Sequence, residues 1–199
     1  MKRLLDKRIV IIGAGSCGKG VGNGKAMAIL FAEQGGKVLC IDSNPEAAHE
    51  TVEEILQSGG DAAMLNIDIT DVEAGKKIMK KASDLWDGID VLVYNVGKSS
   101  QGGVLETELS DWKDVFDVNL NGAFMLVKEV LPFMRSQKQG SIIFISSLAA
   151  VYSAPYSYAP YEISKLALIK LSQTIARENS KFLIRSNSIL PGMIDTPHA

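Results

Sequence analysis

Short apolar runs alternate with longer helix-forming segments along the whole chain. Most of the runs are apolar throughout rather than at every second position, which is typical of parallel strands covered on both faces of a sheet. We therefore predict parallel strands at residues 8–12, 38–41, 62–67, 89–94, 141–146 and 184–190.

The segments between these runs carry helix start and stop signals. Polar residues that can cap a helix, or a proline suited to the first turn, stand at their beginnings, and glycines follow several of their ends. Predicted helices cover residues 23–34, 45–58, 70–87, 110–132 and 160–180, with Asn23, Thr70 and Ser110 as N-caps.

Alternating strands and helices predict a βαβ series with right-handed crossovers. We expect one α/β domain over residues 1–199. Its architecture would be a Rossmann-type doubly wound parallel sheet in the order 3-2-1-4-5-6, with helices on both faces. Ligands of such sheets bind at the carboxyl ends of the strands.

Composition narrows the class of protein. The 199 residues are 46% hydrophobic and 22% charged, which fits one soluble globular domain. A net charge of −2 gives no indication of a nucleic-acid partner, and no apolar run reaches the roughly 20 residues of a membrane helix. Cys17 and Cys40 form neither a disulfide framework nor a metal-ligand spacing. We expect a cytoplasmic protein without a metal site.

A glycine-rich stretch joins the first predicted strand to the first predicted helix. Glycine lets the backbone come within hydrogen-bonding distance of a ligand, and the first turn of a helix offers unpaired N–H groups and partial positive charge. The stretch therefore predicts a phosphate-binding turn.

Two phosphate motifs overlap in this turn. Gly13, Gly15 and Gly18 form G-x-G-x-x-G, the dinucleotide fingerprint. Residues 13 to 19 also read as G-x-x-x-x-G-K, most of a P-loop, although Gly20 stands where a P-loop has the Ser or Thr that holds Mg²⁺.

Acidic residues end the second and third predicted strands. At Asp42, a carboxylate can accept hydrogen bonds from both hydroxyls of an adenosine ribose and would repel a 2′-phosphate, so NAD is favoured over NADP. Lys19 argues for NADP, because it could pair with a 2′-phosphate. Asp68 could accept the adenine amino group or cap a turn. After the fourth strand, Asn95 precedes Gly97, which would let the backbone approach a bound nucleoside.

Tyr161 and Lys165 lie four residues apart in a predicted helix, so they share a face. An ammonium close to a phenol favours the phenolate, and such a phenol can act as general acid or base for an alcohol–carbonyl pair. Ser147, at the end of the fifth strand, could hold a substrate oxygen. Asn119 stands in the middle of a predicted helix, where a polar structural or relay role is plausible.

With these motifs in order, the chain resembles the short-chain dehydrogenase/reductase family over nearly all of its length. Tyr161-Glu-Ile-Ser-Lys165 matches the Y-x-x-x-K signature, and Ser147 precedes the tyrosine. Asn119 in VNLNG matches the fourth catalytic residue. Pro191-Gly-Met-Ile-Asp-Thr196 matches the segment that packs on the nicotinamide end of the cofactor.

The resemblance implies an oxidoreductase that transfers a hydride between NAD(H) and an alcohol or ketone. Tyr161 would be the general acid/base, Lys165 would hold the nicotinamide ribose, Ser147 would orient the substrate oxygen, and Asn119 would support a proton relay. The implied cofactor-binding residues are Gly13, Gly18, Gly22, Asn23, Gly24, Asp42, Asp68, Ile69, Asn95, Gly97, Tyr161, Lys165, Pro191, Ile194 and Thr196.

The sequence departs from the family pattern in several places. Tyr94 and Val96 replace the first asparagine and the alanine of N-N-A-G. The spacing from Ser147 to the tyrosine is one residue longer than the family implies, so Ser146 is a weaker candidate for the serine role. The sequence stops at Ala199, whereas family members continue through a mobile substrate loop, another helix and a seventh strand.

The glycine-rich turn is longer than the family's. Aligning the following helix places Gly22 and Gly24 at the tight turn, with Gly18 before them in G-x-x-x-G-x-G. We infer about five extra residues around Cys17 to Val21. The helix should then begin near residue 23 rather than at Ser16, and the extra N–H groups could wrap further around a pyrophosphate.

Two other functions and one partner are compatible with the sequence. A P-loop nucleotide hydrolase would use the G-K motif, and a catalytically silent relative would serve as a binding module. The helices around residues 115–131 and 163–175 carry apolar positions beyond one stripe. By resemblance, these helices form the face of a homodimer or homotetramer.

Overall fold

The computed structural model describes residues 2–152 and 157–197. Its centre is one six-stranded sheet in the order β3-β2-β1-β4-β5-β6, and every neighbouring pair is parallel. The strands are β1 (Arg8–Ile12), β2 (Lys37–Asp42), β3 (Asp61–Asn66), β4 (Val91–Tyr94), β5 (Gly140–Ile145) and β6 (Ile184–Ile189). The predicted fold class and strand order are confirmed.

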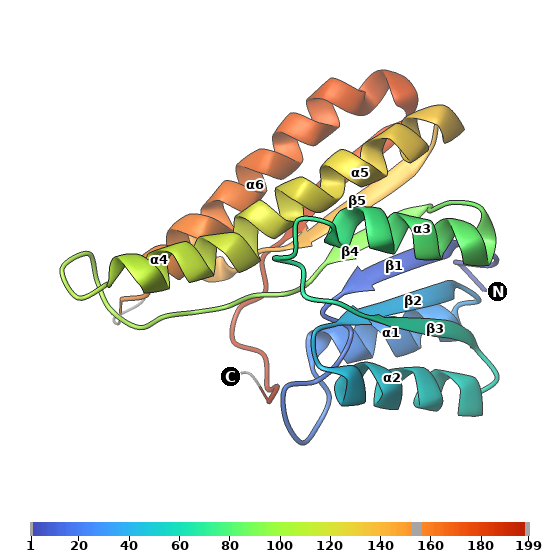
Figure 1. Cartoon of the computed structure of the whole chain (residues 1–199), viewed down its shortest axis with the longest axis horizontal. Coiled ribbons are helices and arrows are strands. Elements are labelled where there is room, and N and C mark those ends of the chain that lie inside the picture. Colours follow the sequence, from blue (N-terminus) through green and yellow to red (C-terminus); the bar gives the residue numbers. More distant parts are fainter. Residues whose placement is uncertain (1, 153–156, 198–199) are drawn as a thin grey trace.

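Helices cover both faces of the sheet (Figure 1). On one face lie α1 (Asn23–Glu33) and α2 (Pro45–Gln57), and on the other lie α3 (Ala74–Trp86), α4 (Leu109–Phe116), α5 (Gly122–Gln137) and α6 (Ala159–Asn179). Three short helical segments are η1 (Asp117–Asn121), η2 (Leu148–Ala150) and η3 (Ser180–Phe182). None of the described helices is long and apolar enough to span a membrane.

Each face of the sheet has its own hydrophobic core. Val10 and Ile12 of β1 pack toward α3, α5 and α6, whereas Ile9 and Ile11 pack toward α1 and α2. Successive side chains of a strand point to opposite faces. A strand buried on both sides must therefore be apolar at every position, which is why the strands appear as continuous apolar runs.

The chain order of the strands reverses at β1. This strand pairs with β2 on one side and with β4 on the other, so the connections leave it in opposite directions. The loops that follow β1 and β4 therefore diverge, and a crevice for a ligand forms at the carboxyl end of such a switch point.

The predicted strand positions are confirmed to within one or two residues, but the three predicted N-cap residues were wrong. The N-cap of α1 is Gly22, not Asn23. The N-cap of α3 is Glu73, because Thr70 instead turns its hydroxyl to Asp68 Oδ1 at 2.8 Å. Glu108, not Ser110, occupies the N-cap position of α4.

The long helix predicted at residues 110–132 is also interrupted. It consists of α4, the π-helical segment η1 and α5, and it continues past Pro132 to Gln137. A π-helical turn inserts one residue into the α-helical repeat and often marks a functional position. Asn119 lies within this segment.

Candidate active site

The loops at the carboxyl ends of the strands are tied to one another by hydrogen bonds. Asn95, after β4, donates from Nδ2 to the carbonyl of Gly13, after β1, at 2.8 Å. Leu148, after β5, donates from its backbone N–H to the carbonyl of Pro191, after β6, at 2.8 Å. The predicted site residues that follow four different strands are thus brought to one edge of the sheet.

The glycine-rich turn brings the start of α1 against the end of β1. Gly13 has a φ of +77°, and a Cβ on Gly24 would lie 1.7 Å from the Gly13 carbonyl oxygen. No side chain fits at Gly24. The late helix start that the sequence indicated is confirmed, because α1 begins at Asn23.

The same boundary argues against the P-loop. A P-loop runs from its G-K pair directly into a helix. Here Lys19 lies in irregular backbone, and helical structure begins only at Asn23. The P-loop hypothesis is therefore wrong in its structural requirement.

Asp42 lies beside the turn at the end of β2. Its Oδ2 accepts the Gly15 N–H at 2.9 Å, and its Oδ1 accepts the Asn44 N–H at 3.0 Å. A carboxylate has about four lone-pair positions, so both oxygens can accept further hydrogen bonds. This chemistry fits the two hydroxyls of a ribose.

The residues after β3 form a smaller polar group. Oδ1 of the exposed Asp68 accepts from both the backbone N–H and the hydroxyl of Thr70, at 2.9 and 2.8 Å. Ile69 is buried, and its carbonyl lies against Gly122 at the start of α5. The turn therefore caps itself through Asp68, as one of the two sequence interpretations proposed.

Lys165 is the most deeply buried charged group of the candidate site, with 3% of its surface exposed. Its Nζ donates to the carbonyls of Ile145 at 2.9 Å and Val96 at 3.3 Å, and it lies 5.7 Å from the centroid of the Tyr161 ring. Burial lowers the pKa of the Lys165 ammonium to about 8. A Cβ on Gly97 would lie 3.0 Å from this Nζ, so the glycine makes room for the lysine.

Asn119 joins the loop after β4 to α6. Its Oδ1 accepts the Lys98 N–H at 2.8 Å, and its Nδ2 donates to the Lys98 carbonyl at 2.9 Å and to Ser164 Oγ at 2.9 Å. The Ser164 hydroxyl donates in turn to the Tyr161 carbonyl at 2.8 Å. The predicted structural role of Asn119 is therefore present, and its part in a relay stays a prediction.

The two adjacent serines differ in what their hydroxyls do. Ser146 is buried and donates to the Lys165 carbonyl at 2.7 Å. Ser147 is partly exposed and accepts the Ala149 N–H at 3.2 Å. Because accepting that bond leaves the hydroxyl proton of Ser147 free to be donated, Ser147 suits a substrate oxygen better than Ser146 does.

Sequence reasoning gave no role to Tyr94 and Ser164, which support the site. Tyr94 is fully buried, and its hydroxyl donates to the carbonyl of Val118 in the π-helical segment. Burial raises the pKa of Tyr94, so the hydroxyl keeps its proton. A buried tyrosine needs a partner for its hydroxyl. A tyrosine at the end of an apolar strand was therefore a usable signal.

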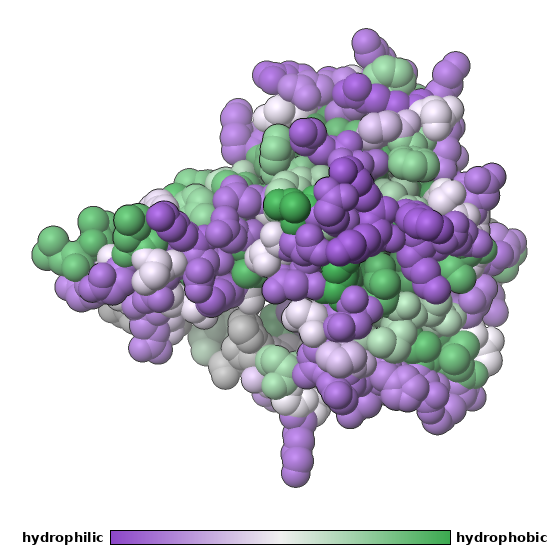
Figure 2. Space-filling model, in the orientation of Figure 1, coloured by the Kyte–Doolittle hydropathy of each residue, from purple (hydrophilic) through white to green (hydrophobic). Residues whose placement is uncertain are grey.

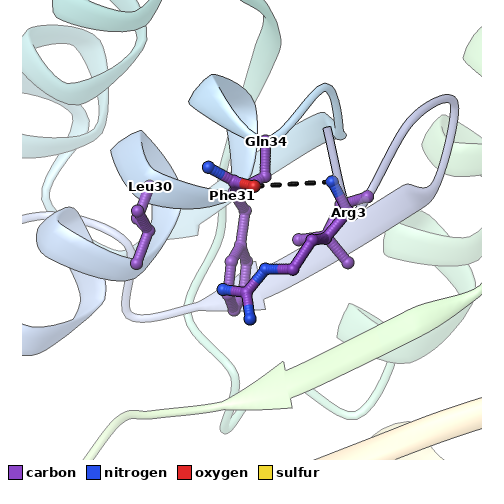
Figure 3. A pocket seen from close by; sticks show the side chains of 5 residues that line it. Arg3, Leu30, Phe31 and Gln34 are labelled. Atoms are coloured by element: carbon purple, nitrogen blue, oxygen red, sulfur yellow. Dashed lines mark hydrogen bonds between the residues drawn. The ribbon is translucent and has the colours of Figure 1, made fainter. Parts of the chain in front are cut away.

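The hollows elsewhere on the surface lie away from this edge. One is lined by Arg3, Leu4, Leu30, Phe31 and Gln34, between the N-terminal segment and α1 (Figure 3). Since this hollow lies near the start of β1 and the end of α1, it faces the amino ends of the strands. No group of three or more His, Cys, Asp or Glu side chains within residues 2–152 and 157–197 is arranged to hold a metal ion.

Replacing Lys165 by Met should change how stability depends on pH. The pKa of Lys165 falls from 10.5 to about 8 on burial, so between these values the unfolded chain holds a proton that the folded chain has released. The free energy of unfolding of the wild type should therefore rise relative to Lys165→Met as pH rises through this window, by up to about 3 kcal/mol.

Urea denaturation at intervals from pH 7 to 10.5 measures this difference, with Lys170→Met, an exposed position of the same helix, as the control. A difference between wild type and Lys165→Met that stays constant with pH would contradict the low pKa of Lys165.

Comparison with known proteins agrees with this geometry. A family model described as short chain dehydrogenase matches residues 7–199. The 3-oxoacyl-(acyl-carrier-protein) reductase FabG of Thermotoga maritima is 34% identical over 195 residues, which cover 98% of this chain and 77% of that protein.

Solved structures agree as well. A short-chain type dehydrogenase/reductase from Mycobacterium marinum has a TM-score of 0.91 at 29% identity, covering 98% of this chain and 78% of that one. NAD⁺-bound xylitol dehydrogenase has a TM-score of 0.88 at 31% identity, covering 96% and 72%. The chain belongs to the short-chain dehydrogenase/reductase family.

Proposed function

We propose that this chain is an NAD-dependent oxidoreductase that transfers a hydride between NAD(H) and a small-molecule alcohol or ketone. The observation that carries the proposal is the network around Lys165. It joins Tyr161, Asn119 and the end of β5, where Ser147 lies, at one edge of the sheet.

The residues present fit a nicotinamide dinucleotide. The glycine-rich turn and the start of α1, with Gly13, Gly18, Gly22, Asn23 and Gly24, suit the diphosphate. Asp42 suits the adenosine ribose, and Asp68 with Ile69 suits the adenine. Along the rest of the edge, Asn95 and Gly97 adjoin the switch point, while Pro191, Ile194 and Thr196 suit the nicotinamide end. A relative in its NAD⁺-bound form supports the choice of NAD over NADP.

When bound, the cofactor supplies or accepts the hydride. Tyr161 moves the proton to or from the substrate oxygen, acting as general acid in reduction and general base in oxidation. The ammonium of Lys165 lies 5.7 Å from the centroid of the Tyr161 ring, so it places a positive charge next to the side chain that transfers the proton.

The other side chains position these two. Lys165 uses two of its three donors on backbone carbonyls, which leaves the third for the nicotinamide ribose. Ser147 donates its hydroxyl proton to the substrate oxygen and fixes that oxygen beside Tyr161. Asn119 holds the loop after β4 and, through Ser164, the backbone of Tyr161.

Replacing Tyr161 by Phe should abolish proton transfer while keeping the ring. We expect turnover to fall by about 10²-fold or more and NADH binding to change little. The measurement is a screen of alcohols with NAD⁺ and of ketones with NADH, followed by NADH absorbance, with the exposed Tyr152→Phe as control. Full turnover in Tyr161→Phe would make the mechanism wrong. NADH binding without turnover of any pair by the wild type would favour the catalytically silent alternative.

Replacing Asp42 by Asn should relax the choice of cofactor. Loss of the negative charge removes repulsion of a 2′-phosphate, so the ratio of the NADPH to the NADH dissociation constant should fall about tenfold. Titration of intrinsic fluorescence with each nucleotide gives the ratio. Asp68→Asn is the matched control, because adenine is common to both cofactors and its loss of charge should leave the ratio unchanged. An unchanged ratio in Asp42→Asn would assign cofactor choice to another residue.

We also propose that two or four copies associate through α5 and α6. Phe124 and Phe133 on α5 and Ile163 and Leu166 on α6 are exposed, and these two helices lie side by side on one face (Figure 1). Figure 2 shows further apolar surface at the projecting end of the molecule, where the loop before α4 exposes Val104 and Leu105. Exposed apolar surface of this extent is typical of an interface.

Replacing Leu166 by Lys should disrupt this association, because the introduced charge would be buried in the interface without a partner. Sedimentation velocity should show a dimer or tetramer for the wild type and smaller species for Leu166→Lys. Leu56→Lys is the control, since Leu56 is equally exposed but lies on α2, on the opposite side of the sheet. A wild-type monomer at all concentrations tested would contradict the proposed association.

A further inference from the structure

The extra residues of the glycine-rich turn form a loop with a closed neck. The Gly22 N–H donates to Ser16 Oγ at 2.7 Å, and a Cβ on Gly22 would lie 3.5 Å from the Gly15 carbonyl oxygen. The backbone therefore departs from the turn after Ser16 and returns to nearly the same place at Gly22.

The loop is thus an addition to a turn that is complete without it. Removal of residues 17–21 would leave Gly13-Ala-Gly-Ser-Gly22-Asn-Gly24, an uninterrupted G-x-x-x-G-x-G. The close approach of Gly24 to Gly13 and the hydrogen bond from Gly15 to Asp42 involve no residue of 17–21.

The far side of the loop touches the segment that follows β6. A Cβ on Gly18 would lie 3.3 Å from Pro197 Cβ, and a Cβ on Gly20 would lie 3.3 Å from Pro197 Cγ. Gly20 also has a φ of +119°, which other residues rarely adopt. Figure 1 shows the blue loop after β1 beside the red end of the chain, although they stand at opposite ends of the sequence.

The composition of the loop suits an anion. Residues 13–24 contain no acidic side chain, and Lys19 adds an exposed positive charge. Figure 2 shows a hydrophilic projection at the place where Figure 1 draws the loop after β1. Consecutive backbone N–H groups in glycine-rich turns can form concave anion sites, and here they lie between the start of α1 and the segment after β6.

We propose that residues 17–21 and Met193–Pro197 form a clasp that closes over the diphosphate of the cofactor, and that their contact at Pro197 slows cofactor release. This inference depends on the proposed function, since it takes the cofactor to be a nicotinamide dinucleotide. A segment that covers a bound ligand acts mainly on the dissociation rate, because the ligand can leave only when the cover opens.

The test compares NADH release from three proteins: the wild type, a variant with residues 17–21 deleted, and Pro197→Gly. NADH fluorescence gives the dissociation constant, and displacement by excess NAD⁺ in a stopped-flow instrument gives the dissociation rate. Deletion should raise the dissociation rate about tenfold while the association rate changes little. Pro197→Gly should raise it by a smaller factor, because the loop remains and only its contact is lost.

The outcomes separate the clasp from the proposed function. An unchanged dissociation rate in the deletion variant, with NADH still bound, would overturn the clasp and leave the proposed function intact. If the deletion variant does not fold, an unchanged rate in Pro197→Gly would overturn the clasp equally. A wild type that binds neither NADH nor NADPH would overturn the proposed function itself.

Discussion

The geometry of the candidate site depends on one buried charge. The ammonium of Lys165 is shielded from water, and the free-energy cost of that burial is offset by the carbonyls of Val96 and Ile145. Val96 follows β4 and Ile145 is the last residue of β5, so the lysine ties α6 to the ends of both strands. Gly97 must lack a side chain, because a Cβ there would crowd the Lys165 ammonium. A methionine would fill the space without the cost, so the proposed role of Lys165 and the stability of the fold conflict at this position.

Polar side chains without a proposed chemical role hold the candidate catalytic side chains in place. Ser146 and Ser147 differ because the Ser146 side chain is buried against α6, whereas the Ser147 side chain is partly exposed. The hydroxyl of Ser146 donates to the Lys165 carbonyl, so only the Ser147 hydroxyl can take the proposed role of holding the substrate oxygen. Asn119 is also fixed by hydrogen bonds, since its side-chain amide is paired with Lys98 and Ser164. The Tyr94 hydroxyl binds the neighbouring carbonyl of Val118. Each of these bonds joins residues far apart in the sequence.

Whether a feature depends on local residues or on residues far apart in the chain explains which features could be predicted from the sequence. Strands and their order follow from apolar runs and from crossover rules, which are local or general, so they were predicted well. Helix starts were less predictable, because Thr70 can cap a helix or bond Asp68, and the sequence alone does not decide between them. The π-helical turn depends on contacts with β4 and α6, so the sequence around Asn119 did not show it. The site positions came from a matching motif, while their partners required the fold.

The glycine-rich turn shows the limit of motif spacing most clearly. The literal G-x-G-x-x-G at Gly13, Gly15 and Gly18 assumes that residues close in sequence are consecutive in the turn. In the structure the turn passes from Ser16 to Gly22 across one hydrogen bond, and Gly18 lies in the added loop against Pro197. The residues that lie next to each other in space, rather than in sequence, recover the family pattern. An insertion is tolerated here because its two ends already lie together, so the loop can be added without moving the start of α1.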